Sequence, residues 1–138
     1  MKSFLDTNIL AYLFDQEDRR KQEVARATVR RLMDAREAAV SSQVVQEFVN
    51  VATRKFRKPL STAEVRDFLD QILWPICEVF PDRALYADAL SIVDETGWTF
   101  YDSLIVGAAV AARCPVLFTE DLQTGRVVRG VEIRNPFV

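Results

Sequence analysis

Five short apolar runs alternate with longer segments of helical pattern along the whole chain, and this alternation constrains the fold more than any other feature. Such alternation is typical of β–α units, in which parallel strands form a sheet between layers of helices. We therefore predict an α/β fold with a central parallel sheet of about four to five short strands, covered by helices on both faces. The predicted strands are residues 3–5, 38–41, 76–80, 115–118 and 131–133.

The segments between these runs carry helix signals. The segment 43–56 repeats apolar residues at helical spacing, and the capping-box sequence at 61–64 begins a helix over 62–73. Pro75 is expected to stop that helix. The other predicted helices are residues 7–14, 19–35, one capped by Asp82 and closed by Gly97, and the almost wholly apolar, buried helix 104–112.

Length and composition indicate an ordinary globular protein. The 138 residues fit one domain, 1–138, and 49% of them are hydrophobic and 28% charged. Cys77 and Cys114 lie in apolar surroundings and are expected to be buried, reduced thiols without a disulfide framework. Neither a secretory signal nor an apolar run long enough to cross a bilayer is found, so we expect a cytoplasmic protein with no membrane partner.

The chain contains no histidine, which narrows the chemistry available to it. Ser-His-Asp and Cys-His nucleophile systems, histidine acid–base pairs and histidine-containing zinc sites are excluded. Two well-separated cysteines provide no zinc site either. Catalysis would have to come from carboxylates, lysine, tyrosine or hydroxyl groups, and carboxylates favour hard metals such as Mg²⁺ and Mn²⁺.

Four of the 20 acidic residues lie where a reaction centre is expected. Asp6 and Asp121 follow predicted strands, at the sheet edge where α/β proteins bind ligands, and Asp102 opens the apolar helix. The alternative role for each aspartate is a helix N-cap. Glu47 lies within a helix at the margin of its apolar face, where a carboxylate needs a metal or, alternatively, an arginine partner. Glu78 can point to solvent from its strand and is assigned no role.

Carboxylates that converge at strand ends repel one another and take up protons unless cations neutralise them. One or two Mg²⁺ ions would do so. The ions could also activate a water molecule, hold a scissile phosphate and stabilise the leaving oxygen. The sequence thus predicts a metal-dependent enzyme that cleaves phosphodiester bonds.

The segments around these acids resemble the PIN-domain family, and more narrowly the VapC-like toxin nucleases of bacterial toxin–antitoxin pairs. They are residues 4–10, 42–48, 101–105 and 117–122, and residues 130–137 resemble the end of the family's chains. The resemblance covers essentially the whole chain, in the same order. It implies a PIN-like fold and an Mg²⁺-dependent endoribonuclease that cleaves single-stranded or loop RNA, with Mn²⁺ able to substitute.

The resemblance also implies roles for residues and partners. The catalytic and metal-binding residues would be Asp6, Glu47, Asp102 and Asp121. Asn8 and Thr119 would orient these ligands without binding the metal themselves. The chain would form a homodimer, and a cognate antitoxin would insert a segment into the active-site groove.

The formal net charge of −2 argues weakly against general affinity for nucleic acids, so RNA would need a local basic surface. The segment at 54–58, here called the basic segment, follows the Glu47 helix and is favoured for contacts with RNA phosphates. For the clusters at 19–21 and 30–31 a solvated helix face is the favoured interpretation. The basic segment contributes Arg54, Lys55, Arg57 and Lys58.

Two other functions stay open at this stage. A haloacid-dehalogenase-like phosphatase also begins with an aspartate after the first strand, but it normally has a second one two positions on, where this chain has Asn8. A catalytically silent PIN-like domain would bind RNA or protein only. Trp98, Phe100 and Tyr101 could stack on RNA bases, although packing in the core is favoured for them.

Overall fold

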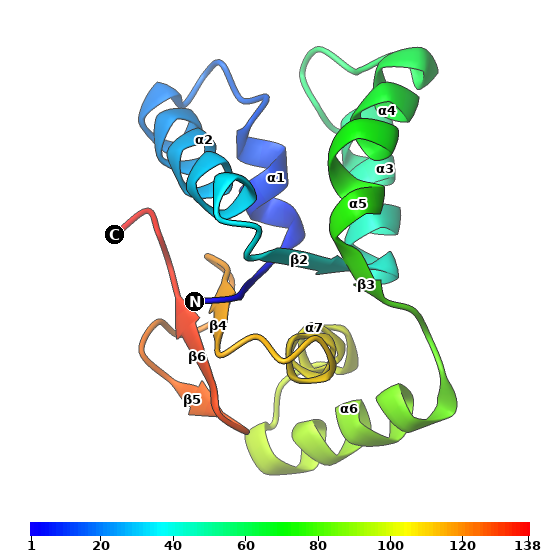
Figure 1. Cartoon of the computed structure of the whole chain (residues 1–138), viewed down its shortest axis with the longest axis vertical. Coiled ribbons are helices and arrows are strands. Elements are labelled where there is room, and N and C mark those ends of the chain that lie inside the picture. Colours follow the sequence, from blue (N-terminus) through cyan, green and yellow to red (C-terminus); the bar gives the residue numbers. More distant parts are fainter.

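The computed structural model describes residues 1–138 and shows a six-stranded sheet in the order β3-β2-β1-β4-β6-β5 (Figure 1). All strands are parallel except β5, which pairs antiparallel with β6. The predicted α/β fold is confirmed, and each predicted strand is present. The strands are β1 (Ser3–Leu5), β2 (Ala38–Ser41), β3 (Cys77–Val79), β4 (Val116–Phe118), β5 (Val127–Val128) and β6 (Val131–Arg134).

The strand β5 was not predicted. It has only two residues, and its pairing depends on the tight connection to β6. Arg129 and Gly130 form that connection with φ angles of 50° and 81°. Positive φ at both central residues is the geometry that joins antiparallel strands without splaying them. The turn, and not the strand sequence, therefore creates this edge of the sheet.

Helices lie on both sides of the sheet (Figure 1). The helices α1 to α5 lie on one side, and α6 and α7 pack against each other on the opposite side. From β1 the chain first adds β2 and β3 on one side of this strand and then adds β4, β6 and β5 on the other side. The order of strands thus reverses between β1 and β4, whose carboxyl ends lie side by side. The helices are α1 (Thr7–Tyr12), α2 (Arg19–Asp34), α3 (Ser42–Arg54), α4 (Thr62–Phe68), the π-helix η1 (Leu69–Leu73), α5 (Trp74–Ile76), α6 (Arg83–Thr96) and α7 (Phe100–Ala111).

Two helix boundaries differ from prediction. Pro75 does not stop its helix, because the chain passes through the wide turns of η1 into α5. There Trp74 donates its N–H to the carbonyl of Leu69, and Pro75 stands in the first turn of α5, where a missing N–H is tolerated. The apolar helix α7 begins before Asp102, because Thr99 is its N-cap.

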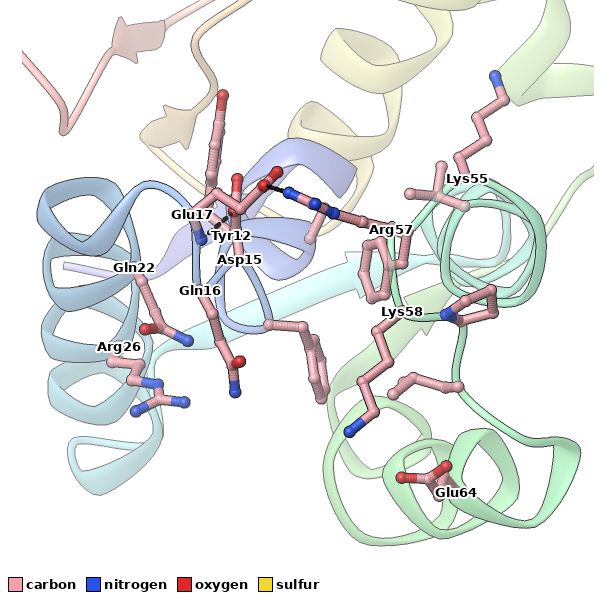
Figure 2. Close-up of a pocket in the computed structure, with 16 residues that line it drawn as sticks. Tyr12, Asp15, Gln16, Glu17, Gln22, Arg26, Lys55, Arg57, Lys58 and Glu64 are labelled. Atoms are coloured by element: carbon pink, nitrogen blue, oxygen red, sulfur yellow. Dashed lines mark hydrogen bonds and ion pairs between the residues drawn. The ribbon is translucent and has the colours of Figure 1, made fainter.

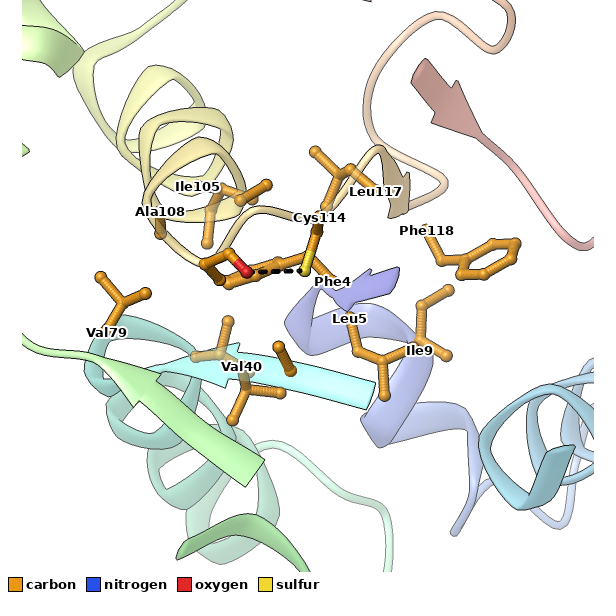
Figure 3. Packing of buried hydrophobic residues seen from close by; sticks show 14 of the residues in the cluster. Phe4, Leu5, Ile9, Val40, Val79, Ile105, Ala108, Cys114, Leu117 and Phe118 are labelled. Atoms are coloured by element: carbon orange, nitrogen blue, oxygen red, sulfur yellow. Dashed lines mark hydrogen bonds between the residues drawn. The ribbon is translucent and has the colours of Figure 1, made fainter. Parts of the chain in front are cut away.

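One continuous core fills the space between the sheet and the two helix layers. Phe4, Val40 and Leu117 contribute side chains from three neighbouring strands, and Ile105 meets them from α7 (Figure 3). Most of α7 is buried, as its apolar sequence predicts. None of the helices is long and apolar enough to cross a membrane.

The two cysteines differ in exposure. Cys114 is buried, as predicted, whereas Cys77 is only half-buried, because β3 is an edge strand. Neither forms a disulfide. Burial raises the pKa of the Cys114 thiol to about 11 and also raises that of Cys77, so both stay protonated at neutral pH. Glu78 points to solvent as expected and contacts Lys2 at 2.8 Å.

Candidate metal and active site

Asp6 lies at the carboxyl end of β1 and is the N-cap of α1. One carboxylate oxygen accepts the N–H of Thr7 at 2.7 Å, and the other accepts the hydroxyl of Thr119 at 2.8 Å. The side chain is only 8% exposed. Burial raises its pKa to about 6, and the charges of Glu47 and Asp121 add to the effect. Asp6 is therefore a helix cap and also the buried centre of a group of three carboxylates, Asp6, Glu47 and Asp121, here called the acidic cluster.

Glu47 comes to this cluster from α3 and is half-buried, as its place at the margin of the apolar face predicts. Its two carboxylate oxygens accept the hydroxyl of Thr7 at 2.9 Å and the amide of Gln43 at 2.8 Å. The alternative of an arginine salt bridge is wrong, because Glu47 takes part in no ion pair. Sequence reasoning missed Gln43, although its position one turn before Glu47 places the two on one helix face.

Asp121 follows β4 in a bend, is exposed, and precedes no helix. Its interpretation as a helix cap is therefore wrong. The amide of Asn8 lies between three acceptors: Asp121 at 3.1 Å, Thr119 at 3.2 Å and, more weakly, Asp6 at 3.5 Å. The hydroxyl of Thr119 also accepts the backbone N–H of Asp121 at 3.1 Å. Asn8 and Thr119 thus tie the first and last aspartates together through hydrogen bonds.

Asp102 occupies the third position of α7 and is half-buried. Thr99 caps this helix by accepting the N–H of Asp102 at 3.2 Å, so the cap interpretation is also wrong for Asp102. Its carboxylate makes no hydrogen bond within the protein. The connection to the cluster is indirect: the amide of Gln43, which binds Glu47, also donates to the carbonyl of Tyr101 at 3.3 Å.

The cluster lacks positive charge. Neither its three carboxylates nor Asp102 has a lysine or arginine partner. Lys21 is paired instead with Glu120, which precedes Asp121 in the chain, at 2.8 Å. No three acidic side chains are arranged closely enough to hold a metal ion in this structure. Nevertheless, the donor set of oxygen ligands without counter-charge, with a buried carboxyl of raised pKa at its centre, fits a hard divalent cation.

Lys21 is part of a polar network that sequence reasoning missed. Its ammonium contacts Glu120 at 2.8 Å and the hydroxyl of Tyr12 at 3.1 Å, and that hydroxyl donates to Glu120 at 2.7 Å. The backbone N–H of Glu120 donates to Asn8 at 3.3 Å. The network holds the Glu120 carboxylate away from Asp121, its neighbour in sequence. Within the cluster at 19–21, therefore, Lys21 is not simply solvated.

The basic segment is exposed, and three of its four residues line a cavity of about 820 Å³ (Figure 2). Arg57 forms an ion pair with Glu17 across this cavity. Tyr12, at the end of α1, also lines it, whereas Asp6 caps the start of α1. A helix of six residues rises about 9 Å, so the cavity lies roughly that far along α1 from the acidic cluster.

The three aromatic residues near Asp102 behave differently from one another. Trp98 is half-buried beneath the guanidinium of Arg126, 4.6 Å from the ring centre, and Phe100 is half-buried against the core. Tyr101 is 68% exposed. The prediction that core packing explains all three is therefore wrong for Tyr101, because the first turn of α7 projects it outward.

Comparison with solved structures shows the fold shared across low sequence identity. A toxin–antitoxin complex from Klebsiella pneumoniae has a TM-score of 0.64 at 18% identity, with 97% of each chain covered. VapBC2 from Rickettsia felis, bound to a DNA fragment from its promoter, gives 0.63 at 20% identity, with 98% of each chain covered. VapC20 from Mycobacterium tuberculosis, a toxin that cleaves the sarcin–ricin loop, gives 0.60 at 20%, with 86% of this chain and 91% of that one covered.

Comparison with curated protein sequences gives no significant match. The sequence model of the PIN domain, however, matches residues 3–129. This match includes Asp6, Glu47, Asp102 and Asp121, and every element except β6. The chain therefore belongs to the PIN domain family.

Proposed function

We propose that this chain is an Mg²⁺- or Mn²⁺-dependent endoribonuclease that cleaves single-stranded or loop RNA, acting as the toxin of a bacterial toxin–antitoxin pair. One observation carries the proposal: segments as distant as α1, α3 and the end of β4 bring carboxylates without basic partners to the carboxyl edge of the sheet of a PIN domain. Ligand sites of open α/β sheets lie at this edge, where the chain order reverses.

Asp6, Glu47, Asp102 and Asp121 would hold the metal. A bound Mg²⁺ would supply Lewis acidity, lowering the pKa of a water molecule and neutralising charge on the phosphate. The protein's own contribution is orientation: Thr7 fixes Glu47 beside Asp6, and Asn8 with Thr119 fixes Asp121. These hydrogen bonds leave each carboxylate with unused oxygen lone pairs, which is what a ligand to a hard cation needs.

The proposed reaction is the hydrolysis of a phosphodiester bond. Water adds to phosphorus, the bond from phosphorus to the leaving ribose oxygen breaks, and that oxygen takes up a proton. The products are a phosphate monoester and a free hydroxyl. Neither a side-chain nucleophile nor a histidine is required, which agrees with a chain that contains no histidine. Asn8, whose amide donates hydrogen bonds, offers none of the acid–base chemistry that a dehalogenase-like phosphatase needs at this position.

RNA as the substrate class draws support from two sources. The basic segment provides cations for RNA phosphates at a cavity that the far end of α1 also lines, whereas Asp6 caps the other end of that helix. Among the proteins of similar fold, VapC20 is described as cleaving the sarcin–ricin loop. The structures from Klebsiella and Rickettsia are toxin–antitoxin assemblies. We propose the same kind of partner here, an antitoxin protein, together with a homodimer of this single-domain chain in the cytoplasm.

The direct test is RNA cleavage by the purified protein in Mg²⁺. Wild-type chain should cut at discrete sites in a panel of structured RNAs, and Asp102→Asn should cut at least about 100-fold more slowly, as expected when a metal-ion charge partner is lost. Asp94→Asn is the matched control, because Asp94 is exposed on α6 and makes no ion pair. A wild-type protein that binds these RNAs but cuts none of them would make it a binding module instead.

A further inference from the structure

A second cavity, of about 320 Å³, is connected to the acidic cluster through Gln43, which lines it and binds Glu47, and it has no role in the site described so far. It is formed where the start of α3 meets the first turns of α6 and α7. One wall is aromatic and the other is polar. Tyr86, Phe100 and Tyr101 form the aromatic wall, and Ser42, Gln43 and Gln46 form the polar wall.

The aromatic wall is ordered, yet it faces solvent. The rings of Tyr86 and Phe100 meet edge to face, with centroids 6.0 Å apart, and Phe100 meets Tyr101 in the same way at 5.8 Å. Tyr101 is 68% exposed and Tyr86 45% exposed. Edge-to-face contacts fix the orientation of each ring and leave a flat face free. An exposed ring held in this way is a platform on which another planar group can stack.

The polar wall is hydrogen-bonded to the acidic cluster. The amide nitrogen of Gln43 donates to Glu47 at 2.8 Å and to the carbonyl of Tyr101 at 3.3 Å. Asp102 is the next residue in the chain. A group inside this cavity therefore meets Gln43, which binds Glu47, and Tyr101, which precedes Asp102 in the chain. A strand whose phosphate reached these two carboxylates would bring a neighbouring base to Tyr101.

Gln43 also carries an unused hydrogen-bond acceptor. Its side-chain oxygen is buried and has no partner. The assignment of nitrogen and oxygen is fixed by chemistry, because both neighbours of the nitrogen are acceptors. A buried acceptor without a partner is unfavourable. Because this oxygen is shielded from solvent, a ligand N–H reaches it only when the Gln43 side chain shifts toward the cavity, and the new hydrogen bond then removes the penalty. The amino and imino groups of nucleobases are such donors.

We propose that this cavity, here called the base pocket, binds one nucleobase of the RNA strand beside the scissile phosphodiester. Tyr101 stacks on the base, and Gln43 accepts a hydrogen bond from its N–H edge. The proposal rests on the proposed function, since it takes RNA as the substrate. A second copy of the chain would also cover exposed aromatic rings, but an apolar contact would leave the Gln43 oxygen unsatisfied, whereas a base both stacks and donates.

The test is a cycle between a protein variant and an RNA variant. A short RNA that the wild-type chain cuts is compared with the same RNA carrying an abasic ribose next to the cut site, on either side in turn. For one of the two positions, removing the base should lower kcat/KM about tenfold or more, the effect expected from base–aromatic stacking. Tyr101→Ala should lose a similar factor on the intact RNA and show little further loss on the abasic one.

Two further variants serve as controls. Tyr101→Phe keeps the ring and should retain the wild-type preference for the intact RNA. Trp74→Ala removes an aromatic side chain that is 46% exposed but lies outside the pocket, and it should behave like the wild type. The base pocket is overturned if the losses from Tyr101→Ala and from the abasic site multiply, since the ring and the base then act independently.

Other outcomes separate the base pocket from its neighbouring hypotheses. If Tyr101→Ala turns a dimer into a monomer in sedimentation and cuts both RNAs as the wild type does, the surface belongs to a second copy and the proposal is wrong. If the wild-type chain cuts no RNA, the proposed function fails first. The same cycle is then measured as binding of labelled RNA in EDTA, and equal Kd values for intact and abasic strands overturn the base pocket by themselves.

Discussion

Replacing Asp6 with asparagine should stabilise the metal-free protein at neutral pH. The folded protein holds the Asp6 carboxyl at a pKa of about 6, compared with an ordinary value of 3.8, chiefly because the group is buried. Since the folded pKa is the higher one, the folded state binds this proton more tightly than the unfolded state. Stability from this group is therefore fully present below about pH 4 and is lost as the pH rises through about 6.

The size of the effect follows from the two pKa values. A difference of about two units corresponds to about 3 kcal/mol of unfolding free energy lost by pH 7, and about half of that by pH 5. Asparagine carries no charge at any of these pH values. It can still cap α1, although altered hydrogen bonds to Thr7 and Thr119 add an offset of about 1 kcal/mol that does not depend on pH.

The assay is urea unfolding in EDTA at a series of pH values, for wild type, Asp6→Asn and the control Asp94→Asn. The unfolding free energy of Asp6→Asn relative to wild type should rise by about 2.5 kcal/mol between about pH 4 and pH 7. Asp94→Asn should follow the wild type throughout. A difference for Asp6→Asn that stays constant across this range would refute the claim that Asp6 is a buried, charge-strained carboxylate.

Three further outcomes are expected. Replacing all four cations of the basic segment with glutamine should weaken RNA binding and flatten its dependence on salt, as measured by anisotropy titrations at several salt concentrations; an unchanged slope would place the RNA elsewhere. EDTA should stop RNA cleavage and Mn²⁺ should restore it in a gel assay, so cleavage that continues in EDTA would overturn the mechanism. Phe4→Ala should lower the unfolding free energy by about 3–5 kcal/mol in urea, since the Phe4 side chain is fully buried in the core; a loss below about 1 kcal/mol would contradict this packing.

The sequence predicted the sheet well because each parallel strand is a short apolar run with helices between. It could not predict β5, whose two residues pair only because the Arg129–Gly130 turn brings them back. It also wrongly predicted that the helix stops at Pro75. The wide turns of η1, which lead into the short helix α5 that contains Pro75, leave no mark in apolar periodicity. Local patterns thus specify regular elements, whereas turn geometry decides the edges and ends.

The candidate site was predicted unevenly for a similar reason. Glu47 stood out because a carboxylate at the margin of an apolar face needs an explanation, and the structure places it beside Asp6. The aspartates looked like helix caps, and only Asp6 is one. Gln43 was missed because its second partner, the carbonyl of Tyr101, is 58 residues away in the sequence and comes beside Gln43 only in the folded chain.

Calorimetric titration of Mn²⁺ into the metal-free protein tests the central claim, that this carboxylate cluster is a metal site. At about pH 6, the wild-type chain should bind the ion and release about half a proton, because Asp6 is then half protonated and must ionise. The release is measured from the dependence of the heat on the buffer. Asp6→Asn should bind at least about tenfold more weakly and release no proton. Equal affinity and equal proton release in the two proteins would contradict the account.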